Sequence, residues 1–361
     1  YNYYKYSLYS IITTNTLFLE VTEMKLLTVT VPCYNSADYI SKSIESLLVG
    51  GDRMEIIIID DGSKDDTGVI ADSYAAKYPD IVKVVHQPNG GHGEGINQGV
   101  ANATGLYFRV CDSDDWVDGD ALLKLLDKIE ELEKNGGVDL IITNYVYTHD
   151  DPKLDNVMEY KHEFRNGKAT TWAQTRAFGL STYLMLHSCT YRTDVIRKCG
   201  IVLPKHVFYE DNLFVYAPLP YTEKLCYLNI NLYHYYIGRE GQSVQSDVFA
   251  RRYAQQIFIS KTIFMLYDIG EQIALNKKRG KFMYHELRML LAIATAGARL
   301  NGSEQAEQDC VDMWKECIEH DPKYGKKLRY RSPIAFQAIP GEGGRRFANC
   351  LYRITRKLVK N

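Results

Sequence analysis

Three carboxylates directly follow a short apolar stretch of the chain. Residues 106–111, Leu-Tyr-Phe-Arg-Val-Cys, have the length and the aromatic and β-branched content of a buried strand, and Asp112, Asp114 and Asp115 come after it. In open α/β sheets, ligands bind at the carboxyl ends of strands. Three neighbouring carboxylates repel one another unless a cation lies among them, and oxygen ligands suit Mg²⁺ or Mn²⁺. The alternative is a solvated acidic turn that caps the next helix.

A second buried strand also ends in carboxylates. Residues 54–59 include four consecutive isoleucines and stop at Asp60 and Asp61, and a strand predicted at residues 26–31 stops at Pro32. Strands that alternate with helices at this spacing predict a mostly parallel sheet with right-handed crossovers, which aligns successive strand ends along one edge. Acids that collect at one edge favour a ligand site over unrelated turns.

The rest of the chain is predicted from hydrophobic spacing. An α/β fold with a mostly parallel central sheet flanked by helices is expected, followed by a mainly helical C-terminal region. The further predicted elements are helices at 67–78, 96–103, 121–132, 170–186 and 212–217, strands at 81–86, 138–147 and 188–192, a glycine-rich loop at 89–95, and helices from residue 251 onward.

Length and composition indicate a globular protein of about two domains. The chain has 361 residues, of which 45% are hydrophobic and 24% charged. We divide it into an extension at 1–23 that we expect to be disordered, a main α/β domain at 24–240, and a helical region at 241–361. The main domain is expected to consist of two halves, residues 24–130 and 131–240.

Charge and cysteine usage restrict the partners and the compartment. Residues 24–150 carry 10 basic and 22 acidic residues, which argues against nucleic acid as a partner. The eight cysteines form no C-x-x-C pair, and a reducing cytosol fits this pattern. No apolar run reaches the roughly 20 residues that span a bilayer, and residues 1–23 lack the features of a signal peptide. Residues 344–361 form a basic amphipathic pattern, which either contacts the inner face of the plasma membrane or packs on its own domain.

One further acidic pair lies in an aromatic setting. Glu210 and Asp211 are flanked by Phe208, Tyr209 and Phe214. Low polarity makes a charge costly unless the charge is used or paired, so the pair is a candidate for acid–base chemistry. The alternative is that Asp211 caps the helix predicted to follow it.

Together these motifs resemble the family 2 glycosyltransferases of the GT-A type. The resemblance covers about residues 25–130, and the order and spacing of its motifs agree with the family. It rests on Val31-Pro32-x-Tyr34-Asn35, on Ile56 to Asp60-Asp61-Gly62-Ser63 with Asp65 and Thr67, on Asn89-Gly90-Gly91 to Asn97 with Gly99, on Ala103-Thr104-Gly105, and on Asp112-Ser113-Asp114-Asp115-Trp116. Glu210-Asp211 lies where such enzymes place their general base.

The resemblance implies transfer of a sugar from a nucleotide-diphosphate donor, most often a UDP-sugar, to an acceptor hydroxyl of a glycan or glycolipid. Inversion by a single displacement is implied, with Asp211 as the base and Glu210 as its nearest rival. A divalent cation, Mn²⁺ or Mg²⁺, would be held by Asp114 and Asp115, with Asp112 either assisting or binding the ribose. The residues implied to bind the nucleotide-sugar are Pro32, Tyr34, Asn35, Asp60, Asp61, Gly91, Asn97, Asp112 and Asp114.

The chain departs from the family at one position. Where the family often has arginine directly before the asparagine, this chain has Ile96 before Asn97. The change puts in doubt how the diphosphate is held. His92, four residues earlier, could replace a contact, although a loop histidine is more often incidental.

Three other classes of protein compete with this interpretation. A receiver-type signalling module clusters aspartates in the same way but needs a lysine at the end of a fifth strand, and residues 138–147 contain none. A hydrolase with paired carboxylates would release sugar to water. The third alternative is a non-catalytic peripheral membrane protein that retains a nucleotide-sugar-binding fold.

Overall fold

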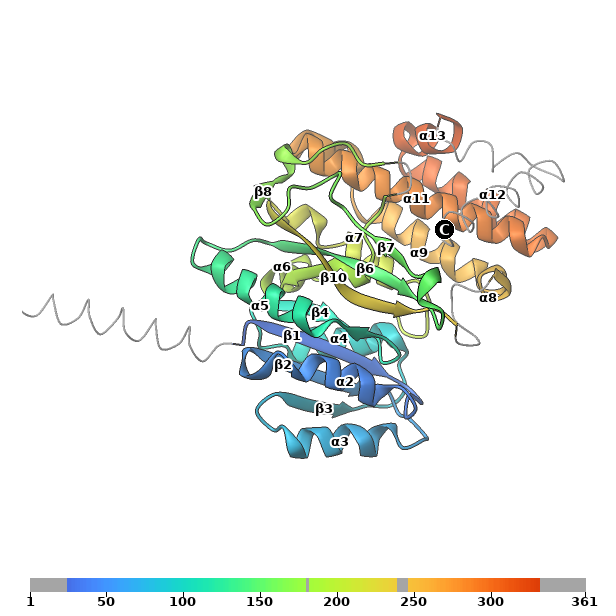
Figure 1. The fold of residues 1–361 in the computed structure, drawn as a ribbon. Coiled ribbons are helices and arrows are strands. Elements are labelled where there is room, and N and C mark those ends of the chain that lie inside the picture. The colour runs from blue at the N-terminus through green and yellow to red at the C-terminus, as the bar shows by residue number, and fades with distance from the viewer. Residues whose placement is uncertain (1–24, 180–181, 239–245, 332–361) are drawn as a thin grey trace, which may run out of the picture.

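One mixed sheet organises the protein (Figure 1). This computed structural model describes residues 25–179, 182–238 and 246–331. The strands are β1 (Leu27–Cys33), β2 (Met54–Asp60), β3 (Val82–His86), β4 (Tyr107–Val110), β5 (Trp116–Val117), β6 (Leu140–Thr148), β7 (Asn156–Met158), β8 (Ala169–Thr171), β9 (Cys189–Arg192) and β10 (Lys224–Tyr236). Their order is β3-β2-β1-β4-β9-β6-β10-β5, with β7 on β6 and β8 on β10.

The first four strands of this order are parallel, as the sequence predicted. The pairings of β1 with β2 and of β2 with β3 set Cys33, Asp60 and His86 side by side. β4 lies on the other side of β1, where Thr30 pairs with Val110. The carboxyl ends of these strands therefore share one edge of the sheet. Every residue of β1 and β2 is buried, which explains their nearly continuous apolar sequence.

The helices cover both faces of the sheet. The described α-helices are α2 (Ile40–Leu48), α3 (Thr67–Lys77), α4 (His92–Asn102), α5 (Gly119–Glu133), α6 (Thr193–Cys199), α7 (Asp211–Tyr216), α8 (Ser246–Arg251), α9 (Tyr253–Leu266), α10 (Ile269–Leu275), α11 (Lys277–Asn301), α12 (Glu304–His320) and α13 (Pro322–Arg331). Helix α2 contacts α3 and α5 on one face, and α4 contacts α6 on the other (Figure 1). Helices α9, α11 and α12 pack together beyond β8 and β10, so the predicted helical C-terminal region is confirmed.

Of two neighbouring elements that the sequence predicted, the helix is absent and the strand is present. The described residues of 170–186, which are 170–179 and 182–186, do not form the predicted helix: β8 and a short 3-10 turn at Trp172–Gln174 come first, and 175–179 and 182–185 have no regular structure. Trp172 instead stacks on Phe282 of α11 at 5.2 Å and donates from Nε1 to the carbonyl oxygen of Thr222 at 3.0 Å. Tertiary contacts therefore determine the conformation of this stretch. The strand predicted at 188–192 is present as β9, antiparallel to β4 and β6.

Helix α4 begins earlier than the sequence predicted. Residues 89–95 were expected to form a loop, with the helix starting at Ile96, but the helix already starts at His92. Its glycines allow close packing on β1: a Cβ at Gly95 would lie 2.8 Å from the Pro32 Cβ, and a Cβ at Gly99 would lie 2.3 Å from the Thr30 Oγ1. Glycine is used here for contact with a strand rather than for a turn.

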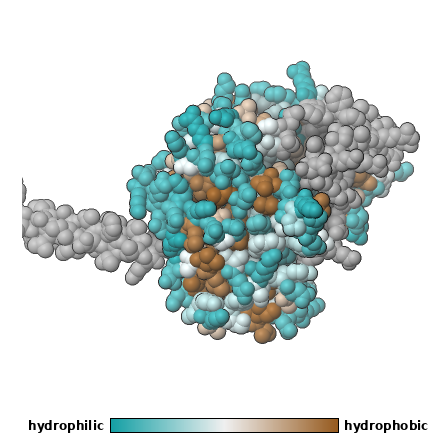
Figure 2. Space-filling model, viewed as in Figure 1, coloured by the Kyte–Doolittle hydropathy of each residue, from teal (hydrophilic) through white to brown (hydrophobic). Residues whose placement is uncertain are grey.

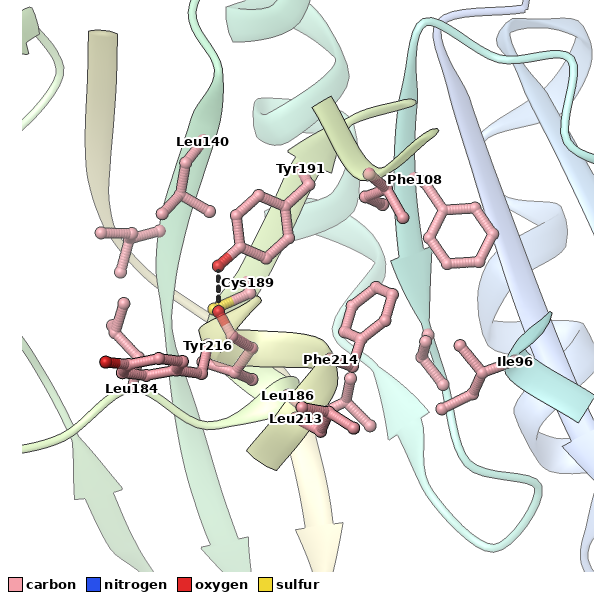
Figure 3. Close-up of a cluster of buried hydrophobic side chains, with 14 of the residues drawn as sticks. Ile96, Phe108, Leu140, Leu184, Leu186, Cys189, Tyr191, Leu213, Phe214 and Tyr216 are labelled. Carbon is pink, nitrogen blue, oxygen red and sulfur yellow. Dashed lines mark hydrogen bonds between the residues drawn. The ribbon is translucent and has the colours of Figure 1, made fainter. Parts of the chain in front are cut away.

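The core joins the two halves of the sheet. Phe108 of β4 and Tyr191 of β9 both contact Phe214 of α7, with ring centroids 6.0 Å and 6.1 Å apart (Figure 3). The Tyr191 hydroxyl donates to the carbonyl oxygen of Val215 at 2.6 Å. This packing fixes the start of α7, which carries Asp211, against the strand that precedes Asp112.

The surface in Figure 2 is mostly hydrophilic, with apolar residues scattered in small groups. Within the described ranges, no helix has the length and apolar character needed to cross a bilayer. The predicted extension at 1–23 and the basic segment at 344–361 lie outside the described residues.

Candidate active site

Asp60 and Asp61 lie at the end of β2 and make different contacts. Asp60 accepts from the Ser63 backbone N–H at 3.0 Å and lies 2.9 Å from His86 Nδ1. Its burial would raise the carboxyl pKa, but these hydrogen bonds outweigh burial and lower it. Asp61 accepts from the backbone N–H groups of Gly90 and Gly91, both at 2.7 Å. Asp60 therefore secures the turn after β2, whereas Asp61 holds the loop before α4.

The predicted residues after β1 form the neighbouring part of the edge. Pro32 is buried under α4, while Tyr34 exposes 46% of its surface beyond the strand end. Asn35 adopts a positive φ of 50° and accepts from the Lys64 backbone N–H at 2.9 Å. The structure therefore leaves only the Tyr34 ring of these three available to stack on a planar group.

Asn97 contacts the chain that leads to Glu210. Its Oδ1 accepts from the Leu203 N–H at 2.9 Å and its Nδ2 donates to the Leu203 carbonyl oxygen at 3.0 Å. Gly91 has a φ of 85°, and a Cβ there would lie 2.8 Å from the backbone nitrogen of His206. Asn97 thus anchors Leu203 and Gly91 allows the close approach of His206, so both residues position the segment that leads to Glu210.

His92 connects the end of β4 with the start of α7. Its Nε2 lies 3.0 Å from Asp112 Oδ1 and its Nδ1 lies 2.8 Å from Glu210 Oε1. Burial by itself would lower the pKa of His92, but the two carboxylates raise it well above 6.5. The ring is therefore a cation that donates to both acids.

The three acids after β4 differ in exposure and in partners. Asp115 is 1% exposed; it accepts from the Tyr233 hydroxyl at 2.6 Å and from the Tyr236 backbone N–H at 2.9 Å. Its pKa is raised well above 3.8 by burial and by the charges of Asp114 and Asp112. Asp112 and Asp114 are both partly exposed. The trio therefore combines one deeply held carboxylate with two that reach the surface of the site.

A metal could be held by Asp112, Asp115 and His187. One oxygen of each acid and one ring nitrogen of His187 lie within 4.8 Å of one another. His187 is 4% exposed, and within the described residues its Nδ1 has no hydrogen-bond partner. Burial lowers its pKa to about 4, so the imidazole is neutral near pH 7. A neutral imidazole and two carboxylates are a set of donors that suits a divalent cation.

Glu210 and Asp211 lie at the start of α7. Asp211 is the first residue of the helix and Glu210 occupies the capping position, so the structure does not support the alternative that Asp211 caps a helix at 212–217. Glu210 is 3% exposed and faces His92, whereas Asp211 is partly exposed. Burial and the charge of Glu210 raise the pKa of Asp211 to about 7. An acid with this pKa can accept a proton near neutral pH.

Sequence reasoning missed several contributors to the site. His187 directly follows the stretch wrongly predicted as a helix, and Tyr233 lies in β10, where no site residue was predicted. Arg109, 1% exposed, donates from Nη1 to Thr190 Oγ1 at 2.9 Å, and its Nη2 donates to the His187 carbonyl oxygen. The one available signal was an arginine within an otherwise apolar strand.

Solved structures identify the class of fold. TarS of S. aureus (residues 1–349, in complex with UDP-GlcNAc) superposes with a TM-score of 0.65 at 20% identity, covering 91% of this chain and 92% of TarS. A mannosyltransferase of Pyrobaculum calidifontis, in complex with GDP-Man and Mn²⁺, superposes with a TM-score of 0.50 at 15% identity, covering 87% and 86%. The fold is the GT-A fold that the sequence predicted.

The family follows from the sequence comparisons. Residues 28–199 match the model for glycosyl transferase family 2. The putative glycosyltransferase EpsH of Bacillus subtilis is 28% identical over 325 residues, covering 85% of this chain and 87% of EpsH. The uncharacterized glycosyltransferase EpsJ of the same organism is 26% identical over 332 residues, covering 84% and 89%. This chain is a family 2 glycosyltransferase, as the motifs predicted.

Proposed function

We propose that the enzyme transfers a sugar from a UDP-sugar to an acceptor hydroxyl with inversion at the anomeric carbon. The observation that carries the proposal is the bridge made by His92. It joins Asp112, at the end of a strand in the donor half (24–130), to Glu210, directly before Asp211 in the acceptor half (131–240). Acids of two distant segments thus lie next to one another across a single imidazole, which would bring the donor and acceptor sides of the site together.

The donor would bind at the edge formed by β1, β2 and β4. Asp61 is buried, its backbone N–H donates to the carbonyl oxygen of Cys33 at 2.9 Å next to the exposed Tyr34, and a uracil N–H would be a further donor to its carboxylate. Asp112 would accept from the ribose hydroxyls or assist the metal. Solved structures of TarS with UDP-GlcNAc and with UDP support a uridine donor, while the GDP-Man complex of the mannosyltransferase makes guanosine the alternative to test.

A divalent cation, Mn²⁺ or Mg²⁺, fits the residues present. Asp114, Asp115 and Asp112 would hold it; burial, followed by the charges of Asp114 and Asp112, raises the pKa of Asp115, so a cation would offset the repulsion between these acids. When bound, the cation would stabilise charge on the departing diphosphate as a Lewis acid. The Mn²⁺ bound in the mannosyltransferase complex with GDP-Man supports this choice of metal.

Asp211 would take the proton from the acceptor hydroxyl. It is more exposed than Glu210, and its pKa of about 7 suits a base near neutral pH. Glu210 accepts from His92 Nδ1 at 2.8 Å, which commits it to an ion pair and leaves it as the weaker candidate. Attack by the activated hydroxyl on the face opposite the diphosphate inverts the anomeric carbon in one step.

The acceptor and the location are proposed at a coarser level. We expect a hydroxyl of a glycan or glycolipid in surface polysaccharide synthesis. We place the enzyme in the cytoplasm, with residues 344–361 as the candidate contact with the inner face of the plasma membrane. The similarity to EpsH and EpsJ supports a bacterial glycosyltransferase but identifies neither the sugar nor the acceptor.

The test begins with the donor. Thermal unfolding of the full chain with Mn²⁺ and a panel of UDP-sugars and GDP-mannose should show one UDP-sugar that raises the midpoint, because a ligand of the native state stabilises it. Asp61→Asn should remove that selectivity. Stabilisation by GDP-mannose alone would overturn the uridine assignment.

Turnover is tested with the selected donor and candidate acceptor glycans, by measuring nucleotide release and the anomeric configuration of the product. Asp211→Asn should abolish transfer while leaving donor affinity within a few-fold. Asp194→Asn, an exposed acid in the first turn of α6, is the matched control and should retain transfer. Normal turnover of Asp211→Asn, or undiminished activity in excess chelator, would overturn the assigned roles.

A further inference from the structure

His187 is held in one orientation by its surroundings. Its ring lies against the rings of Tyr233 and Tyr235, with centroids at 4.6 Å and 4.7 Å. Its backbone carbonyl accepts from the buried guanidinium of Arg109, which also lies 5.5 Å from the Tyr233 ring centroid. Both the backbone and the ring of His187 are thus fixed, as the residues around a metal ligand fix its orientation.

The imidazole has a buried nitrogen without a hydrogen-bond partner, and one of its two ring nitrogens lies beside the acids. Nδ1 makes no hydrogen bond within the described residues although the side chain is 4% exposed. Leaving a buried polar atom without a partner costs about 1–3 kcal/mol. One of the two ring nitrogens lies within 4.8 Å of an oxygen of Asp112 and of an oxygen of Asp115. A cation among these three atoms would use all of them.

The two acids keep acceptor capacity for such a cation. Asp115 accepts two hydrogen bonds, from the Tyr233 hydroxyl and the Tyr236 N–H, and Asp112 accepts one from His92. A carboxylate has about four lone-pair sites, so each acid has sites left. The hydrogen bonds therefore orient the carboxylates without using them up.

We propose that His187 is a direct nitrogen ligand of the divalent cation, together with Asp112 and Asp115, and that it makes the site select Mn²⁺ over Mg²⁺. Mg²⁺ favours oxygen ligands and retains its waters, whereas imidazole is a ligand of transition metals. The proposal deepens the proposed function, on which it rests, because it identifies a ligand that lies outside the Asp112–Asp115 motif. It also gives a role to His187, which takes no part in the proposed transfer reaction otherwise.

Pulsed electron paramagnetic resonance of Mn²⁺ bound to the full chain, without donor, tests the ligand directly. The wild-type spectrum should show coupling to a directly bonded ¹⁴N nucleus. His187→Gln should remove that coupling and weaken Mn²⁺ binding by at least about tenfold, since even outer-shell partners of a metal contribute about 10–100-fold. The preference for Mn²⁺ over Mg²⁺ should shrink in the same variant.

His234→Gln is the matched control. His234 is also an aromatic-stacked histidine of this region, 5.3 Å from Trp116, but one ring nitrogen already contacts Thr148 Oγ1 at 3.0 Å. The variant should keep the nitrogen coupling. Absence of coupling in the wild-type protein, or its persistence in His187→Gln, would overturn the proposal, and the wild-type spectrum decides even if the variant fails to fold.

Different results would contradict the proposed transfer function and the proposed metal-ligand role of His187. Turnover of a UDP-sugar without nitrogen coupling to Mn²⁺ would remove His187 from the metal and leave the transfer intact. Nitrogen coupling without transfer to any acceptor would support the ligand and count against the proposed function.

Discussion

Asp112 and Glu210 are joined through one imidazole, with His92 Nε2 3.0 Å from Asp112 Oδ1 and Nδ1 2.8 Å from Glu210 Oε1. Asp112 follows a strand of the parallel half of the sheet, and Glu210 directly precedes α7. His92 therefore ties both halves of the proposed site together. The positively charged His92 lies one helical turn before Ile96 in α4, and Ile96 is the position at which the family often has arginine.

His92→Gln should destabilise the protein in a pH-dependent way. The folded-state pKa of His92 is raised above 6.5, so its contribution is complete below about pH 6.5 and is lost as the pH rises through the folded value. We expect a loss toward the low end of the about 3–5 kcal/mol for a broken buried pair, because 37% of the side chain is exposed and solvent screens it. Denaturant unfolding at pH 6 and pH 9 measures it. A difference between wild type and variant that does not shrink at the higher pH would contradict a charged His92.

The transfer rate should follow the protonation of Asp211. Burial and Glu210 raise the Asp211 pKa from 3.8 to about 7, so the base is protonated at lower pH. We expect kcat/KM to rise about tenfold per pH unit up to about pH 7 and then to level off. Initial rates between about pH 5.5 and 8.5, with Mn²⁺ and donor saturating, give the profile. A rate that stays flat across this range would remove Asp211 as the titrating base.

The parallel part of the fold could be predicted because its signals are local. Continuous apolar runs predicted β1 and β2, and the acids that follow them had to lie at one edge once the strands were parallel. Residues 170–186 could not be predicted in this way, since Trp172 is held by Phe282 and Thr222, far away in the sequence. The start of α4 was misplaced for a different reason: glycine has low helix propensity, and only the packing against β1 shows why the helix contains it.

The candidate site was predictable where carboxylates follow strands and not where tertiary packing supplies a group. Asp60, Asp61 and Asp112 could be placed from strand ends alone. His187 reaches the acids because the antiparallel β9 brings its preceding turn to β6, a pairing with no local signal. Tyr233 reaches Asp115 through the long strand β10. Contacts of this kind arise only from the complete topology.

Gly99→Ala should destabilise the protein although alanine is the better helix former. A Cβ at Gly99 would lie 2.3 Å from Thr30 Oγ1 and 2.5 Å from Thr30 Cβ, inside the α4–β1 interface. Overpacking of this kind costs about 1–3 kcal/mol, which exceeds the gain of about 1 kcal/mol in helix propensity. Chemical denaturation measures the net change. Ala101→Gly, at an exposed position of α4, gives the propensity effect alone, and a Gly99→Ala variant at least as stable as wild type would rule out the tight interface.

Glu286→Gln should stabilise the protein, and more so at higher pH. Glu286 of α11 is 4% exposed and accepts from the Leu184 N–H at 3.2 Å, and burial raises its pKa from 4.5 to about 8. Between these two values the folded state holds a proton that the unfolded state has released, so stability falls as the pH rises through this window. Glutamine keeps an oxygen acceptor for Leu184 and does not titrate. The stability difference should therefore grow from about pH 5 to a plateau above pH 8, reaching on the order of 4 kcal/mol.

Thermal unfolding of both proteins across that pH range provides the measurement. Glu319→Gln, at an exposed position of α12, serves as the control for removing one negative charge and should shift the midpoint by a small amount that varies little with pH. If the difference between Glu286→Gln and wild type instead stays constant at every pH, Glu286 is not a neutral buried acid. The contact between α11 and the chain just before His187 would then depend on a charged Glu286, and the variant should lose stability throughout because an ion–dipole bond to Leu184 is stronger than a neutral one.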